Sequence, residues 1–243
     1  GVLDYGDGWP RIDGLNLDML FQGDRMELNA NQGHIMGNQI TKSRAVIPVL
    51  DADHPMLEVI SDVQGPVSEG IRFVNNSPVA ETIDHFTDGM KADGNGKLHL
   101  ELRIPLDDVD ATKVKGVYEV SNGIIPGNST LPEASRINGK LEFTESSLRA
   151  QNVAALIYGD PLTFNMETGK DGVMRIAARG RTSYTGLKQA LGSGLTDYLS
   201  GTTEWSGDAT IHKPQVDLAI RSTLVGMASG LPAPLAKTVG DSV

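Results

Sequence analysis

The sequence of 243 residues contains no cysteine, and aromatic side chains make up only 5% of it. Without cysteine, the chain has no disulfide, no thiolate nucleophile and no cysteine ligand for zinc. It also has no run of about 18 apolar residues and no signal peptide at its start. The net charge of −10 disfavours nucleic acid and anionic headgroups as partners, because both require clusters of Lys and Arg. We therefore expect no nucleic-acid partner.

Motifs of the common enzyme and metal sites are also missing from the sequence. The five histidines form no H-E-x-x-H pattern, and no nucleophile elbow, P-loop or dinucleotide fingerprint occurs. Asp93 begins a stretch that resembles a calcium loop, but its twelfth position is Ile104, which cannot ligate the ion. Two acidic groups are typical of solvated turns: Asp51, Asp53 and His54, and Asp107, Asp108 and Asp110. The sequence predicts no catalytic residue, no metal site, no cofactor and no enzyme.

What the chain does contain is alternation of apolar and polar residues, most clearly over residues 96–108. Leu98, Leu100, Leu102 and Ile104 alternate there with Lys97, His99, Glu101 and Arg103. Successive side chains of a strand point to opposite faces, so this segment predicts a strand with one aliphatic face and one polar face. Gly94 and Gly96 precede it, and Pro105 ends it by removing a hydrogen-bond donor.

Similar patterns predict an antiparallel, mainly β chain with 28 glycines in its turns and strands. We expect further strands over 15–21, 26–30, 33–37, 39–47, 57–63, 115–120, 141–143, 173–179, 205–211 and 216–222, with a loop over 122–132. Helical spacing occurs within 66–86, as two short helices, and within 184–199, where Gly201 is expected to end the helix. Strand residues should outnumber helix residues more than twofold.

Short internal matches indicate two related modules within one continuous β-rich segment, 1–243. Residues 11–14 (RIDG) resemble residues 136–139 (RING), and residues 36–38 (MGN) resemble residues 158–160 (YGD). Trp9-Pro10 and Leu131-Pro132 precede the first pair of matches. The division predicted from these matches is 1–110 and 111–243, and their shortness leaves a true duplication open.

Several of these features together resemble the YhdP family of AsmA-like proteins, which is related in kind to TamB and AsmA. They are the strand GKLHLELRIPL, the Trp-Pro and Leu-Pro pairs before Ile-Asp-Gly and Ile-Asn-Gly, and a closing motif over 222–237. The closing motif consists of Ser222, Leu224, Gly226, Leu231, Pro232, Pro234 and Lys237. The resemblance covers nearly the whole chain.

The resemblance implies an elongated, curved antiparallel β-sheet with a few short helices, in a periplasmic segment of a Gram-negative protein anchored in the inner membrane by a helix outside this segment. It also implies that phospholipid acyl chains are carried along an apolar groove toward the outer membrane, and that flanking repeats of the same chain are partners. The residues expected to line this groove are Leu15, Leu17, Met19, Phe21, Leu98, Leu100, Leu102, Ile104, Leu141, Phe143, Val216, Leu218 and Ile220.

Two interpretations from different classes remain open at this point. An aliphatic sheet face must be covered, either by side chains of the same protein or by a ligand such as an acyl chain. The first interpretation is the lipid conduit that the resemblance implies. The second is a non-enzymatic structural or interaction module of the bacterial envelope, whose apolar face is its own core. A carbohydrate-active enzyme on a β scaffold is a third alternative, for which paired carboxylates are the requirement.

Overall fold

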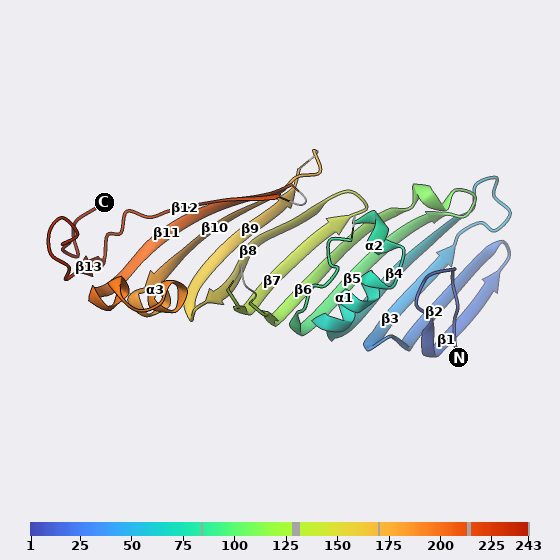
Figure 1. Cartoon of the computed structure of the whole chain (residues 1–243). Helices are drawn as coiled ribbons and strands as arrows, with labels where there is room; N and C mark the ends of the chain where they lie inside the picture. Colours follow the sequence, from blue (N-terminus) through green and yellow to red (C-terminus); the bar gives the residue numbers. More distant parts are fainter. Residues whose placement is uncertain (84, 128–131, 170, 213–214, 243) are drawn as a thin grey trace. The chain divides into compact units, whose positions relative to one another are not determined.

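The structure is a computed structural model that describes residues 1–83, 85–127, 132–169, 171–212 and 215–242. Strands account for 58% of the chain, and the helices are few and short (Figure 1). The strands are β1 Ile12–Gln22, β2 Arg25–Ile35, β3 Asn38–Ile47, β4 Met56–Pro66, β5 Asp93–Pro105, β6 Lys113–Ile125, β7 Ala134–Thr144, β8 Leu148–Ile157, β9 Asp160–Thr168, β10 Met174–Ser183, β11 Leu199–His212, β12 Gln215–Arg221 and β13 Met227–Ser229. The helices are α1 Val67–Asn75, α2 Val79–Thr82 and α3 Tyr184–Leu191, with 3-10 turns η1 Val109–Ala111 and η2 Leu195–Tyr198.

The strands form one open, 13-stranded sheet in which β1 to β12 follow one another in chain order, while β13 pairs with β11. The pairings β1–β2, β2–β3, β3–β4, β4–β5 and β8–β9 are antiparallel. All of these except β4–β5 are joined by short connections, which parallel neighbours do not allow. Strand residues exceed helix residues more than twofold, so the predicted mainly β, antiparallel fold with a few short helices is confirmed.

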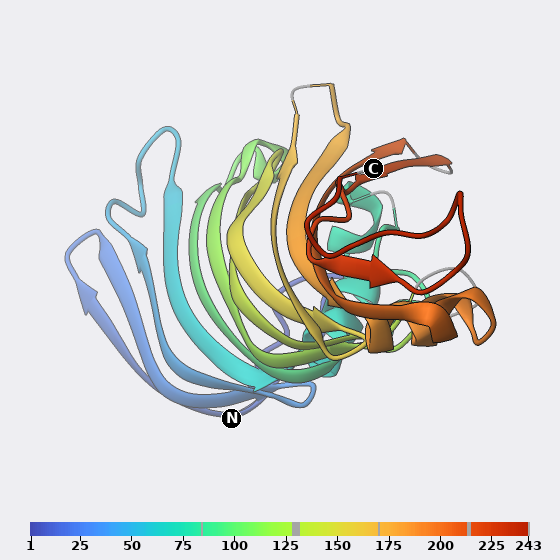
Figure 2. The same cartoon turned by 90° about the vertical axis from the view of Figure 1, so that its left-hand side faces the viewer.

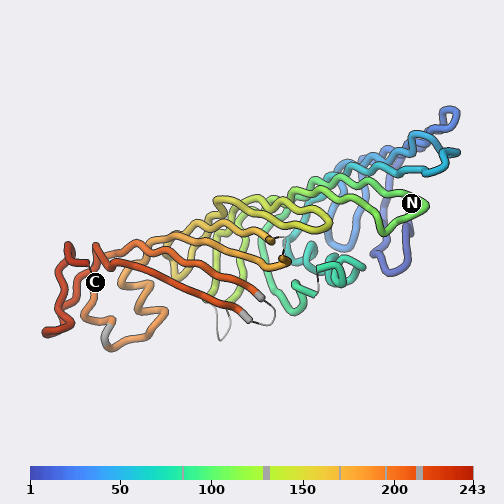
Figure 3. Tube along the Cα trace, turned by 90° about the horizontal axis from the view of Figure 1, so that it is seen from above, coloured from blue at the N-terminus to red at the C-terminus, as the bar shows by residue number. Residues whose placement is uncertain are grey.

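The chain divides into two compact units. Unit 1 comprises residues 1–123 and 140–146, and unit 2 comprises residues 124–139 and 147–243. Each unit contains successive strands lying side by side (Figure 3). The modules predicted at 1–110 and 111–243 remain a prediction.

In unit 1, local sequence explains the turns and the position of the first helix. Gly23 adopts a left-handed φ of 59° in the tight turn between β1 and β2, a conformation that glycine reaches without strain. Pro66 ends β4 and directly precedes α1, where its fixed φ suits the start of a helix. Figure 2 shows the strands of this unit as curved ribbons with α1 and α2 on their concave side.

In unit 2, α3 follows β10 directly and begins at a hydrogen-bonded cap. The Ser183 hydroxyl accepts a hydrogen bond of 3.1 Å from the backbone N–H of Gly186 and donates one of 3.0 Å to Asp160 Oδ2. The Asp160 carboxylate also accepts a 2.7 Å hydrogen bond from the Ser183 N–H. This network fixes the start of α3 beside the first residue of β9.

Several predicted boundaries are wrong in detail. The strands expected over 26–30 and 33–37 form one strand, β2, because backbone pairing with β1 and β3 carries it through a polar stretch. The helix expected over 77–86 contains only the single turn of α2, since His85 turns the chain with a left-handed φ of 53°. β6 continues to Ile125 through a region expected to be a loop, and Asn122 takes a φ of 52° within it.

The helix expected over 184–199 is divided into α3 and η2 at Gly192, which has a φ of 82°. Gly201 does not end a helix but lies inside β11. Three strands, β8, β9 and the short β13, were not expected at all. Leu131 of the Leu-Pro pair lies outside the described residues.

Candidate functional site

The apolar side chains of β1 to β5 share one face of unit 1, because residues directly paired across a ladder point to the same side. Two complete rows cross these strands: Met19, Leu28, Ala45, Val59 and Leu102, and beside it Leu17, Ala30, Ser43, Ser61 and Leu100. Phe21 pairs with Met26, and on β5 Ile104 pairs with Leu57 and Leu98 with Val63. Together with the residues of β6 and β7 described next, these side chains make up the first apolar face.

Close contacts place Leu15, Leu141 and Phe143 on the same face. β1 has a bulge before Leu17, so alternation alone does not tell on which face Leu15 lies. The Leu15 side chain packs over Gly33, which is paired with Ile40. The Tyr118 ring lies over Gly96, which shares a face with Leu98 because the two are two residues apart on β5. In the same way, the Phe143 ring lies over Gly116, which is two residues before Tyr118 on β6. Leu141 is two residues before Phe143 and follows it by alternation. Unit 1 therefore brings together ten of the residues expected to line a groove.

One end of the first apolar face is covered by other parts of unit 1. The Tyr118 hydroxyl lies between Gly96 of β5 and Gly70 of α1, so α1 packs on this face, and burial raises the pKa of Tyr118. The ring of Trp9 lies 6.1 Å from that of Phe73 on α1. Glu69 of α1 accepts a 2.9 Å hydrogen bond from the Gly37 N–H in the β2–β3 turn. At this end the face is a packed core.

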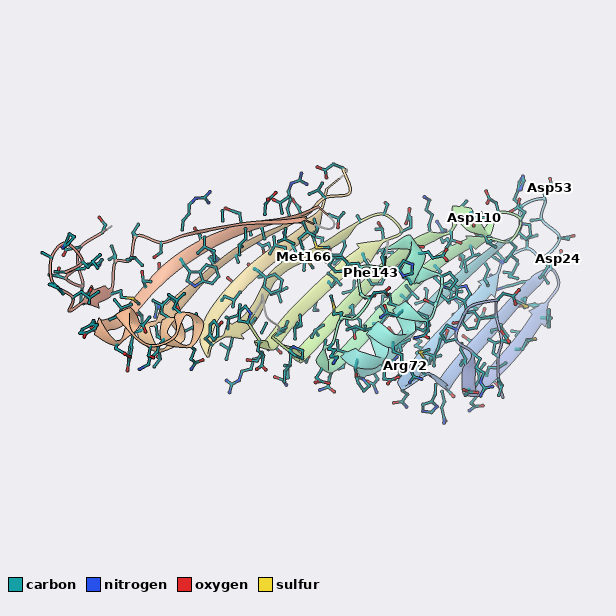
Figure 4. The ribbon with its side chains drawn as sticks, in the orientation of Figure 1. Asp24, Asp53, Arg72, Asp110, Phe143 and Met166 are labelled. Atoms are coloured by element: carbon teal, nitrogen blue, oxygen red, sulfur yellow. The ribbon has the colours of Figure 1, made fainter. Side chains whose placement is uncertain are left out.

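The other end of the face is open. Phe21, Met19 and Leu17 on β1 are 58%, 54% and 37% exposed. Leu98, Leu100, Leu102 and Ile104 are half-buried. In Figure 4, Asp24, Asp53 and Asp110 mark the turns at the ends of the strands away from α1, where Arg72 lies. Large apolar side chains thus meet solvent between α1 and these acidic turns.

Unit 2 has an apolar face of its own, built in the same way. Three rows of paired residues cross its strands. The first row contains Val153, Phe164, Ala178, Gly207 and Ile220, and the second contains Ala150, Met166, Ile176, Ala209 and Leu218. The third row contains Met174, Ile211 and Val216. We call this set, with Leu162, Gly180 and Trp205 in the adjoining row, the second apolar face. Val216, Leu218 and Ile220 lie on the outermost strand, β12, and are 61–63% exposed. These three predicted groove residues therefore share a face with residues that were not predicted.

The residues missed on β8 and β9 include Val153, Phe164 and Met166. Alanines and a bulge at Asn152, with a φ of 51°, interrupt the two-residue period in β8, and Pro161 follows the start of β9. The available signal was the weak alternation of Leu162, Phe164 and Met166 between polar residues.

The opposite face of unit 1 is charged, and its ion pairs run across the strands. Arg44 Nε lies 2.8 Å from Glu27 Oε1, Arg103 lies 2.9 Å from Glu58, and His99 Nδ1 lies 2.7 Å from Asp62. Hydrogen bonds from Arg44, Asn29 and Arg25 lower the pKa of Glu27 to about 2, and the Asp62 carboxylate raises the pKa of His99. Exposed pairs of this kind contribute little to stability, because water and salt screen them. Their main effect is to keep this face hydrated.

Clusters of metal-binding side chains are not found in the described residues. No group of three or more His, Asp or Glu side chains there is placed to hold a metal ion. His54 Nδ1 lies 2.5 Å from Asp107 in the acidic turns, and this hydrogen bond lowers the pKa of Asp107. Among the helices described, none is long and apolar enough to cross a membrane. The prominent features are therefore the two apolar faces.

Comparison with known proteins gives a match over the full length of the chain. The sequence profile of the YhdP family, described as YhdP protein, matches residues 1–243. The intermembrane phospholipid transporter YhdP of Escherichia coli (strain K12) is 25% identical over 247 residues, which cover 96% of this chain and 19% of that protein. The chain thus spans about one fifth of the length of the curated relative it matches. No solved structure gives a significant match.

Proposed function

Since this chain belongs to the YhdP family, we propose that it is a segment of an envelope protein that carries phospholipid between the inner and outer membranes, and that its two apolar faces bind acyl chains. The observation that carries the proposal is the exposure of large apolar side chains on each of these faces: Phe21 and Met19 on the first apolar face, and Leu218 on the second. A soluble protein rarely leaves a contiguous apolar patch of this kind without a ligand or partner.

The physical basis of binding is the removal of apolar surface from water. Each square ångström removed is worth roughly 25 cal/mol, and this gain does not depend on the headgroup. An acyl chain has no polar group to satisfy, so it can lie on a face such as that formed by Val59, Leu100 and Leu102. The headgroup would remain in solvent beyond the sheet. The proposal places the segment in the periplasm, with flanking repeats as its neighbours and a membrane anchor elsewhere in the protein.

The alternative is a structural module whose apolar face serves as its own core. The observation that favours it is the packing of α1 over Gly96 and Tyr118, which closes one end of the first apolar face without a ligand. The open end near Phe21 and Met19 favours the conduit.

The decisive experiment is site-specific photocrosslinking in cells, followed by identification of the adducts by mass spectrometry. A photoreactive phenylalanine analogue at Leu100 or Leu218 should give phospholipid adducts. The same analogue at Glu101 or Ala219, the next residues along the same strands, should give none, because these positions point to the opposite face. Organic extracts of the purified segment should contain phospholipid. Equal adducts from both faces, or none from Leu100 and Leu218, would contradict the conduit.

A further inference from the structure

Two glycines on the apolar faces lie directly beneath aromatic rings. The ring of Phe143 on β7 occupies the space that a Cβ atom of Gly116 on β6 would fill. In unit 2, Trp205 on β11 is paired with Gly180 on β10, and its Cζ2 atom lies 2.8 Å from the position of a Cβ at Gly180. In both places the ring lies down on the backbone of the neighbouring strand instead of standing on its own strand.

A methyl group at either glycine could not be accommodated by a small adjustment. Contacts shorter than about 3 Å between a Cβ and another carbon are strongly repulsive, and a ring is rigid beyond its two torsions. The sheet backbone lies below the ring, so the ring can move only outward or along the strand. At Gly180 the Cβ of Leu162, on the other neighbouring strand, is also close, at 3.0 Å. The ring of Trp205 would therefore turn away from the sheet.

The half-buried rings of Phe143 and Trp205 are among the bulkiest groups on their faces. Lying flat, they add apolar contact area and little height. Turned outward, each would project from the face into the space above it. We propose that Gly116 and Gly180 are positioning residues that keep these rings flat and so keep the acyl-chain path on each apolar face unobstructed. This inference rests on the proposed function and assigns to these two glycines a role in it.

A third pair of a ring and a glycine shows that a ring lying flat on the sheet can also allow a helix to pack over it. Tyr118 lies over Gly96 in the same way, but α1 closes over it, with Gly70 near its hydroxyl. There the ring has no space into which it can turn. Gly96→Ala should therefore destabilise unit 1 and is unsuitable for testing a lipid path.

The test uses Gly116→Ala and Gly180→Ala, each measured for thermal unfolding and for crosslinking to a phospholipid with a diazirine in its acyl chain. Gly230→Ala is the matched control. Gly230 lies outside the two apolar faces, and its added Cβ would meet its nearest atom, the Tyr198 carbonyl oxygen, at 3.7 Å, which is ordinary contact. We expect at least a fivefold loss of crosslinking in the two test variants, no loss in the control, and retained folding in all three.

Removing the displaced ring provides the rescue. Gly116→Ala combined with Phe143→Ala, and Gly180→Ala combined with Trp205→Ala, should crosslink as well as the unmutated protein. If a single variant fails to fold, its double variant still decides the matter, because folding with full crosslinking supports the proposal and folding with lost crosslinking overturns it. In a Trp9→Phe background, Gly180→Ala should shift the emission of Trp205 to longer wavelength.

Folded Gly116→Ala and Gly180→Ala proteins that crosslink like the control would overturn this inference and leave the proposed function intact. Failure of the unmutated protein to crosslink would instead count against the proposed function itself. The two failures are thereby distinguished.

Discussion

Leu100 lies directly across from Ser61 on the first apolar face, and the Ser61 hydroxyl donates a 3.4 Å hydrogen bond to the Lys42 carbonyl. A carboxylate at position 100 would therefore have only an already engaged hydroxyl as its direct neighbour on β4. A charge covered by apolar material without a partner is strongly disfavoured. The adjacent residue, Glu101, is paired with Ile60 on the opposite face.

This relationship predicts the outcome of Leu100→Glu. The variant should lose phospholipid crosslinking while its thermal unfolding changes little, because the half-buried side chain can keep the carboxylate in water when no lipid is present. Glu101→Leu is the control. It removes ion pairs with His99 and Lys115 at 3.6 and 3.7 Å and should leave lipid binding unchanged. Unfolding of Leu100→Glu, with no adduct in the unmutated protein, would favour the structural module.

The outer strand β12 predicts self-association of the isolated segment. Val216, Leu218 and Ile220 are more than 60% exposed on a strand that pairs with β11 alone in the described part of the sheet. Exposed apolar edge strands promote edge-to-edge pairing, and an added lysine opposes it. Leu218→Lys should therefore shift the protein toward monomer in sedimentation velocity experiments. Ala219→Lys adds the same charge on the other face, and a larger effect there would contradict the explanation from apolar exposure.

Acid should weaken unit 1 in part through Glu27. Its pKa is lowered from 4.5 to about 2, first by the hydrogen bond from Arg44. A lowered pKa in the folded state means that the stabilisation is present above pH 4.5 and is lost as the pH falls from 4.5 toward 2. Glu27→Gln should consequently show a smaller fall in melting temperature across that range than the unmutated protein. Glu142→Gln, which removes another carboxylate of unit 1, is the comparison, and equal slopes in all three proteins would contradict this assignment.

The closing motif should depend on Lys237. Its ammonium donates hydrogen bonds to the carbonyls of Met227, at 2.8 Å, and Thr238, at 3.0 Å, and Met227 is only 3% exposed. Hydrogen bonds to charged groups contribute about 1.5–3 kcal/mol. Lys237→Met should therefore loosen residues 224–242 and speed their removal by limited proteolysis, while the strands of unit 1 stay protected. Lys115→Met is the control, and equal cleavage of the two variants would count against the role of Lys237.

The sequence predicted those parts of the fold in which local alternation is strong. The strand around Leu100 and the paired segments β11 and β12 follow the expected two-residue alternation. Leu17, Met19, Phe21 and Leu100 share a face because the pairings from β1 to β5 keep them on the same side of the sheet. β8 was missed because Asn152 bulges from the strand and alanines lie on both of its faces. Neighbouring strands, and not its own pattern, hold it in the sheet.

The candidate site was harder to predict for a related reason. Alternation tells which residues share a face, but not what covers that face. The packing of α1 over Gly96 and Tyr118, and the resting of Phe143 on Gly116, depend on which strands become neighbours. A glycine in a strand pattern signals a bulge or a close approach, and here the second meaning applies.

The strand order of the sheet, which repeats the order of the chain, also has a consequence for how the protein forms. No strand from β1 to β12 has to wait for a partner from a distant part of the sequence, and the longest interruption, between β4 and β5, is occupied by α1 and α2. Short sequence separation between contacting segments speeds folding because little loop-closure entropy is lost. Each new strand can add to an edge already present, so the sheet can grow from its first hairpin in the direction of synthesis.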